Sequence, residues 1–168
     1  MKKLGLILLT LILCIGMVAC QNDNGNGNGD QGNLEGTLEE ILEKIYENAD
    51  VDESFKNFVE EGLYTTEITS ENVSYFLGKD GLEFEAAIAS EPVMMPSAYS
   101  LCLVRVKDGA DIEKMKTDIK DNVDPMKWIC VGVDPQNVIV DNIGDVIFLL
   151  MSNFETQELY DSFLSLEG

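Results

Sequence analysis

The spacing of apolar residues predicts three helices in the first half of the region that follows residue 33. Leucines and isoleucines recur at helical spacing over residues 34–45, and glutamates occupy the opposite face. Asp52 is placed to cap a second short helix that ends at Gly62. A third helix is expected to end near Gly78, because glycine adopts the left-handed conformation that closes many helices.

Helical spacing returns twice in the second half. Asp111 is placed to cap a helix that ends before Asp124, since the residue that precedes a proline avoids helical geometry. Ser152 with Glu155 three residues later has the pattern of a capping box and predicts a last helix. Apolar residues share one face of each segment, which indicates that both helices pack against a core.

Between these helices the pattern changes to that of strands. Residues 82–88 alternate between apolar and polar, and residues 99–107 form a second candidate strand. Residues 138–140 and 146–151 flank a polar segment and predict a hairpin, with residues 141–145 as a turn longer than the two-residue type. The second arm is apolar on both faces, so we expect it to be a central strand covered on both sides.

Strands grouped between helices and joined by hairpins predict the α+β class: an antiparallel sheet of about four strands packed with helices. Residues 128–133 are either a further strand or a buried connector. No internal repeat and no second linker interrupts residues 34–168, which we interpret as one domain.

The first residues have the layout of a secretory signal peptide. Lys2 and Lys3 precede an apolar run over residues 4–17, which is shorter than the roughly 20 residues that a membrane span needs. The sequence Met17-Val18-Ala19-Cys20 resembles the lipobox of bacterial lipoproteins, whose cysteine receives a diacylglycerol and becomes the new N-terminus. We expect residues 1–19 to be a lipoprotein signal peptide and Cys20 to be lipidated. The alternative is an ordinary signal peptide with an incidental cysteine.

Residues 20–33 are expected to form a flexible tether behind the lipid anchor, because asparagine and glycine dominate them. A chain of this length and composition reaches on the order of 20 Å. The whole sequence has 31 acidic and 11 basic residues, and removal of residues 1–19 takes away two lysines, which changes the charge from −20 to −22. An anionic membrane would therefore repel the domain that the lipid retains. We expect a domain that stands off the outer face of the cell membrane.

The composition also excludes several classes of function. So negative a surface repels phosphate backbones, which argues against nucleic acid as a partner. The sequence contains no histidine, which removes Ser/His and Cys/His nucleophile pairs and imidazole metal sites.

Carboxylates are abundant, but none of them stands out as a site. Asp50 and Asp52 open a segment like a calcium loop, yet Phe55 stands where that loop requires glycine. Residues 141–145 are first of all a hairpin tip. A carboxylate pair of the glycosidase type stays open. We expect no catalytic residue, no metal site and no cofactor.

Two cysteines lie in the expected domain. Cys102 and Cys130 could form a disulfide in an exported protein, which would contribute roughly 3–4 kcal/mol. The alternative, which we favour, is a pair of free thiols, because Cys102 lies in the middle of a predicted strand where bridge geometry is uncommon.

Two surfaces are candidates for binding. Met94 and Met95, held between two prolines, and Trp128 either form an adaptable apolar contact surface or close the core. Lys116 and Lys120 belong to the only segment in which bases balance acids. They either decorate a solvated helix or dock an acidic partner.

Residues 97–131 carry a resemblance, above all in the strings RVKDGAD over Arg105–Asp111 and DPMKWIC over Asp124–Cys130. Together with Gly78, the Glu91–Met94 loop and the closing apolar hairpin, they resemble a family of small uncharacterised lipoproteins of Gram-positive Firmicutes, chiefly Clostridia. The resemblance covers most of residues 37–167. The family is labelled a domain of unknown function, so it implies location and a mostly anaerobic setting, which favours free thiols, but no site residue.

These observations predict a membrane-anchored extracytoplasmic lipoprotein that acts as a non-catalytic binding or interaction module, with a protein or another envelope component as its partner. The first alternative is a lipoprotein that captures a small molecule or peptide, which an apolar pocket near Met94 and Trp128 would favour. The second is a histidine-free carboxylate hydrolase, which a cleft with one acid of raised pKa would favour.

Overall fold

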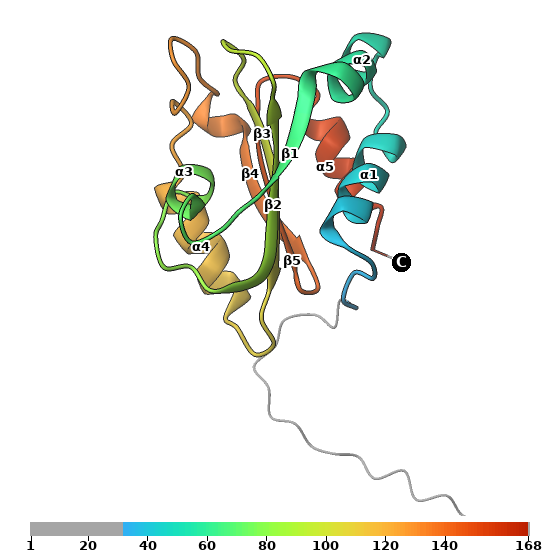
Figure 1. Ribbon diagram of the computed structural model, residues 1–168. Coiled ribbons are helices and arrows are strands. Elements are labelled where there is room, and N and C mark those ends of the chain that lie inside the picture. Colours follow the sequence, from blue (N-terminus) through green and yellow to red (C-terminus); the bar gives the residue numbers. More distant parts are fainter. Residues whose placement is uncertain (1–31, 168) are drawn as a thin grey trace, which may run out of the picture.

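The computed structural model describes residues 32–167, which fold around one five-stranded antiparallel sheet with helices on both faces. The strand order is β1-β2-β3-β5-β4, and every neighbouring pair is antiparallel (Figure 1). The prediction of the α+β class is confirmed. The predicted signal peptide, Cys20 and nearly all of the expected tether lie outside the described residues.

The strands span 63–67, 84–92, 99–106, 138–143 and 146–152. In chain order they are β1 (Leu63–Glu67), β2 (Phe84–Pro92), β3 (Tyr99–Val106), β4 (Val138–Ile143) and β5 (Val146–Ser152). Every residue of β5 is buried, as the apolar pattern on both of its faces predicts.

Helices form where the apolar residues recur at helical spacing. They are α1 (Leu38–Asn48), α2 (Glu53–Gly62), α3 (Val73–Leu77), α4 (Ile112–Asn122) and α5 (Thr156–Leu164), with a short 3₁₀ helix, η1 (Pro135–Asn137). The predicted caps are present, since Asp52 accepts a hydrogen bond from the backbone of Phe55 and Asp111 accepts one from Lys114. Gly78 ends α3 in the left-handed conformation. No helix of the described residues has the length and apolar character needed to cross a membrane.

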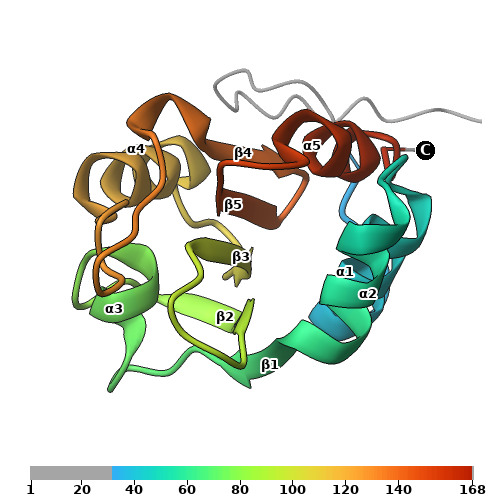
Figure 2. The ribbon, with the colours of Figure 1, turned by 90° about the horizontal axis from the view of Figure 1, so that it is seen from above.

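The core has two layers, one on each face of the sheet (Figure 2). Helices α1, α2 and α5 cover one face, where Ile45 and Phe163 pack with Phe148 of β5. Helices α3 and α4 cover the other face, where Ile119 packs with Leu149, the next residue of β5 on that side. The alternation of side chains along each strand distributes the apolar residues between the two layers.

One strand is missing from the predictions, and two local predictions are wrong. Strand β1 was not predicted, because the residues Leu-Tyr-Thr-Thr-Glu at 63–67 have no clear apolar alternation. The β4–β5 turn has only two residues, since β4 continues to Ile143 and Gly144 supplies the positive φ that a tight turn needs. Ser152 does not cap α5 through a capping box, because it is the last residue of β5 and bonds to the backbone of Phe154.

Different segments of the chain form the two ends of the sheet. The chain enters at the end formed by the β4–β5 turn, where the Arg105 guanidinium donates hydrogen bonds to the carbonyls of Leu34 and Gly36 at 2.9 Å. Arg105 also lies 3.2 Å from the carboxylate of Asp145 in that turn. We call this the entry end. The opposite end, formed by residues 93–98, 123–134 and 153–155, is called the far end.

Candidate binding surfaces

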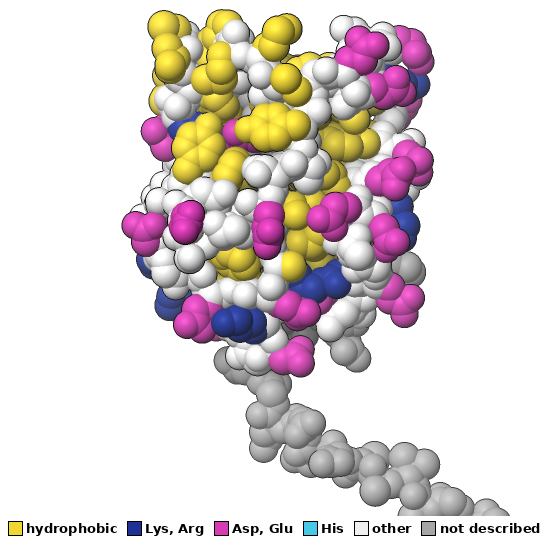
Figure 3. Space-filling model, viewed as in Figure 1, with side chains coloured by type: hydrophobic (Ala, Val, Ile, Leu, Met, Phe, Trp, Pro, Cys, Tyr) yellow, Lys and Arg dark blue, Asp and Glu magenta, His cyan; other side chains and the backbone are white. Residues whose placement is uncertain are grey.

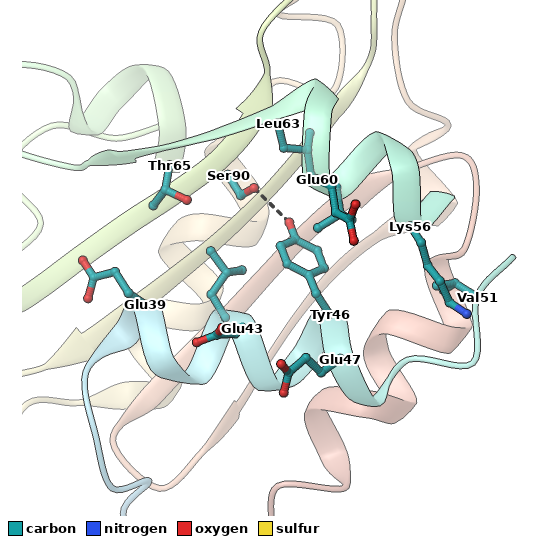
Figure 4. Close-up of a pocket in the computed structure, with 12 residues that line it drawn as sticks. Glu39, Glu43, Tyr46, Glu47, Val51, Lys56, Glu60, Leu63, Thr65 and Ser90 are labelled. Carbon is teal, nitrogen blue, oxygen red and sulfur yellow. Dashed lines mark hydrogen bonds between the residues drawn. The ribbon is translucent and has the colours of Figure 1, made fainter. Parts of the chain in front are cut away.

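A groove of about 590 Å³ lies between α1, α2 and the strands β1 and β2 (Figure 4). It is open to solvent along one side. Its apolar lining comes from both helices, from the loop that joins them and from β1: Leu42, Val51, Val59 and Leu63.

The groove's floor holds a chain of three hydroxyl groups. Tyr46 donates a hydrogen bond to Ser90 at 2.9 Å, and its oxygen lies 3.0 Å from the hydroxyl of Tyr99. Because a hydroxyl has a single proton, Tyr99 is the donor in the second bond. Burial raises the pKa of Tyr46 to about 12, so the floor is uncharged at neutral pH.

The rim of the groove is acidic. Glu39, Glu43 and Glu47 are spaced four residues apart along α1, so they form one row, and Glu60 faces them from α2. The one basic residue of the lining, Lys56, lies 2.9 Å from Glu53 and is already paired. An uncharged lining of apolar groups and hydroxyls beneath a negative rim suits a ligand that combines positive charge with an apolar body.

The far end gathers the large hydrophobic side chains that the described residues leave exposed. Six of them lie in its three loops: Val93, Met94, Met95, Met126, Ile129 and Phe154. The other two, Tyr64 and Tyr75, lie beside Glu91 close to that end. Figure 3 shows hydrophobic side chains collected over the top of the molecule, whereas acidic side chains dominate its lower part and the surface over α2. The entry end has no exposed large hydrophobic residue among those described.

The structure separates the three predicted binding residues. Met94 is 78% exposed and Met95 is 55% exposed, and both line a hollow of about 400 Å³ beside Phe58. Trp128 is only 4% exposed and packs in the core under α3 and α4. Trp128 is therefore not part of an exposed contact surface, because the connector at 128–133 turns its ring inward.

A buried ion pair lies just beneath the far end. Lys127 Nζ is 2.6 Å from a carboxylate oxygen of Glu91, and the two side chains are 6% and 5% exposed. The Tyr75 ring lies 4.4 Å from the same ammonium, and the Ser100 hydroxyl lies 3.5 Å from it. An ammonium held by a carboxylate has no lone pair with which to activate Ser100, and Ser100 itself is fully buried. The cluster is a structural clamp between β2 and the connector that follows α4.

The lysines of α4 are used within the fold. Lys116 binds Asp141 at 3.0 Å and Asn142 at 2.8 Å, and Lys120 donates to the carbonyl of Val138. These bonds join α4 to β4, so neither lysine is free to dock an acidic partner. Sequence reasoning missed this role because it depends on contacts between distant segments.

Both cysteines of the described region are free, as favoured from the sequence. Cys102 is buried in β3, and burial raises the pKa of its thiol to about 11. Cys130 is exposed in the connector and has a positive φ of 63°.

The abundant acidic side chains do not gather into a metal site in the described residues. No group of three or more acidic or cysteine side chains is close enough there to hold a metal ion. Two carboxyl groups, Asp118 and Asp141, have a shifted pKa, and both shifts are downward. A hydrolase that works through a protonated acid needs a shift in the opposite direction.

Sequence reasoning did not find the groove, although one signal for it was present. The glutamates of α1 were assigned to the helix's solvent-facing side, and their four-residue spacing marks the row that became the rim. Their opposite wall could not be located, because β1 was not recognised as a strand.

Comparison of the chain with protein-family models, with curated proteins and with solved structures finds no significant match.

Proposed function

We propose that this chain is a membrane-anchored extracytoplasmic lipoprotein that acts as a non-catalytic interaction module, with the far end as its contact surface for an envelope protein. Support for the anchor comes from the apolar leader and from Cys20 in its lipobox-like context.

One observation carries the proposal: within residues 32–167, the exposed large hydrophobic side chains all lie at or beside the end of the sheet opposite the entry end. Single exposed apolar residues are ordinary, but their concentration on one surface is typical of an interaction site. The two exposed methionines have flexible, polarisable side chains that adapt to a partner's shape.

The position of this surface favours a protein partner over the membrane itself. Because the domain is joined to the tether at its entry end, the far end is left free to face away from the lipid. The negative charge of the domain also opposes close approach to an anionic bilayer. The free-energy gain therefore comes from burying the far end against another protein.

The test compares full-length variants in cells. Wild-type protein is expected to incorporate labelled palmitate and to fractionate with membranes, whereas Cys20→Ser loses both properties. Met94→Ser/Ile129→Ser is expected to stay on the membrane but to lose a partner that co-purifies with wild type. Ala86→Ser, which changes an exposed apolar residue away from the far end, is the matched control and keeps that partner.

Two results would contradict the proposal. One is wild-type protein that carries no lipid and is found away from membranes. The other is a partner that the far-end double variant retains as well as wild type does.

The groove supports a second candidate function, the capture of a peptide or small molecule. The observation that favours it is the uncharged lining of apolar groups and hydroxyls beneath four glutamates. The two functions use different surfaces of the domain.

A further inference from the structure

We propose that the groove and the free edge of β1 together bind an extended basic peptide, which adds to the sheet as a sixth strand antiparallel to β1. This goes beyond the proposed function, because it assigns a second site and the chemistry of its ligand. The site is distinct from the far end, so each proposal can fail without the other.

The first argument is the direction of the backbone groups of β1. Ile68 N–H donates to Ala87, and Val93 N–H donates to Gly62, so these are hydrogen-bonded pairs of the β1–β2 ladder. Such pairs alternate along an antiparallel ladder. The backbone groups of the intervening residues Leu63, Thr65 and Glu67 therefore point away from β2, toward the open edge.

Most of these outward groups have no partner among the described residues. The carbonyl of Glu67 accepts a hydrogen bond from the Asn72 side chain. The Leu63 carbonyl, both backbone groups of Thr65 and the Glu67 N–H are left, and a neighbouring strand binds groups of this kind.

The second argument is that β1 is the uncovered edge of the sheet. Figure 2 shows no helix or loop of the described chain outside β1, whereas α4 packs beside β4 at the other edge. Lys120 of α4 donates to the backbone carbonyl of Val138, and Lys116 bonds to the side chains of Asp141 and Asn142, so α4 is tied to β4. No helix of the described residues is tied to the open edge of β1 in this way; one side chain, Asn72, reaches it at Glu67.

The third argument is charge. Glu39, Glu43, Glu47 and Glu60 line the groove beside this edge, and the one lysine there is paired with Glu53. An incoming strand with lysine or arginine side chains meets complementary charge, whereas an acidic strand is repelled. The occupant is therefore a basic peptide and not a second copy of this strongly acidic chain.

The spacing of side chains along a bound strand also agrees with the spacing of the glutamates along α1. The side chains of Leu63 and Thr65 point into the groove, so the peptide residues paired with them place their side chains on the same face (Figure 4). Residues i and i+2 of a strand lie about 6.7 Å apart along the strand. Glutamates four residues apart on a helix are separated by about 6.0 Å along its axis. A peptide with a basic residue at every second position thus matches the row on α1 charge for charge.

The probe is a fluorescein-labelled seven-residue peptide in which lysine alternates with valine, titrated against the full chain in detergent micelles. Binding is measured by fluorescence anisotropy. In the antiparallel arrangement the lysines point into the groove and direct their backbone groups toward β1. N-methylation of the lysines is therefore expected to abolish binding, and N-methylation of the valines is expected to preserve it.

Two charge variants complete the test. Glu39→Gln/Glu43→Gln is expected to raise the dissociation constant about fivefold, the size of effect that two partly solvated charge pairs give. Asp80→Asn/Asp121→Asn removes the same charge from exposed positions on the other side of the sheet and is expected to leave the constant unchanged within twofold. Met94→Ser/Ile129→Ser is also expected to bind the peptide like wild type, which separates this site from the far end.

Amide hydrogen exchange provides a second measurement that does not depend on charge. The Thr65 and Glu67 amides are expected to exchange rapidly in the free protein and to be protected when the peptide is bound. Those of Tyr64 and Thr66 are protected in both states by β2. The proposal is overturned if the lysine-methylated peptide binds as well as the parent, if both charge variants weaken binding equally, or if bound peptide leaves the Thr65 amide unprotected.

Discussion

Substitution of Lys127 by methionine tests the buried clamp beneath the far end. Methionine keeps most of the apolar stem and removes the ammonium, which lies 2.6 Å from Glu91. The Glu91 carboxylate is then left at 5% exposure with one remaining contact, the Tyr75 hydroxyl at 3.4 Å. Removal of one partner of a buried ion pair costs about 3–5 kcal/mol, because the other charge stays desolvated.

The contact of the ammonium with the Tyr75 ring, at 4.4 Å, adds about 1 kcal/mol to that loss. We therefore expect Lys127→Met to lower the free energy of unfolding by about 4–6 kcal/mol, a large share of the 5–15 kcal/mol typical of a domain. The double variant Glu91→Leu/Lys127→Met is expected to recover most of the loss, because it removes both charges and leaves apolar groups of similar size.

Urea unfolding of the full chain is the appropriate assay, and fluorescence of Trp128, the only tryptophan, reports the transition close to the clamp. A loss of under 1 kcal/mol for Lys127→Met would refute the reasoning. So would a double variant that is no more stable than Lys127→Met alone.

Three further predictions concern other parts of the fold. Tyr46→Phe is expected to cost about 1–3 kcal/mol in urea unfolding, because two hydroxyls lose their shared partner in the groove's floor; an unchanged midpoint would contradict this. Burial acts to raise the pKa of Asp141, but its hydrogen bonds with Tyr160 and Lys116 outweigh burial and lower it. The stabilisation that Asp141 provides is therefore complete above its pKa in the unfolded chain, about 3.9. It is lost as the pH falls through the lower pKa that Asp141 has in the folded protein. The stability difference between wild type and Asp141→Asn should accordingly shrink below about pH 4, and a difference that grows there would contradict the assignment. Iodoacetamide at pH 8 is expected to modify exposed Cys130 and to spare buried Cys102, as peptide mapping by mass spectrometry would detect.

Local patterns were sufficient to predict the parts of the fold that local interactions determine. The caps at Asp52 and Asp111 were predicted because a carboxylate before an apolar helical pattern satisfies backbone donors only a few residues away. The buried strand at 146–151 was predicted because a segment that is apolar on both faces needs cover on both sides.

Features that depend on distant segments were not predicted. Strand β1 exists because β2 pairs with it, and its own residues have little alternation to reveal it. The clamp between Glu91 and Lys127 joins residues 36 positions apart, and nothing in either local sequence marks them as partners. Trp128 is buried for the same reason, since the packing of α3 and α4 decides which side of its connector faces inward.

The same contrast between local and distant interactions applies to the candidate binding surfaces. Met94 and Met95 were identified because two flanking prolines mark a loop, and the structure leaves both side chains exposed. Their neighbours at the far end, Met126 and Ile129, come from another part of the chain. Only the fold brings the two loops to one end of the sheet, so the surface as a whole was out of reach of sequence reasoning.

Site-specific photocrosslinking in living cells tests the central claim most directly, namely that the far end is the contact surface of an anchored module. The photoreactive amino acid benzoylphenylalanine replaces Met94 at the far end in one variant and Asp108 in the β3–α4 loop at the entry end in another. The account predicts a discrete protein adduct from the first position and none from the second. Equal adducts from both positions, or an adduct from Met94 that contains only lipid, would contradict it.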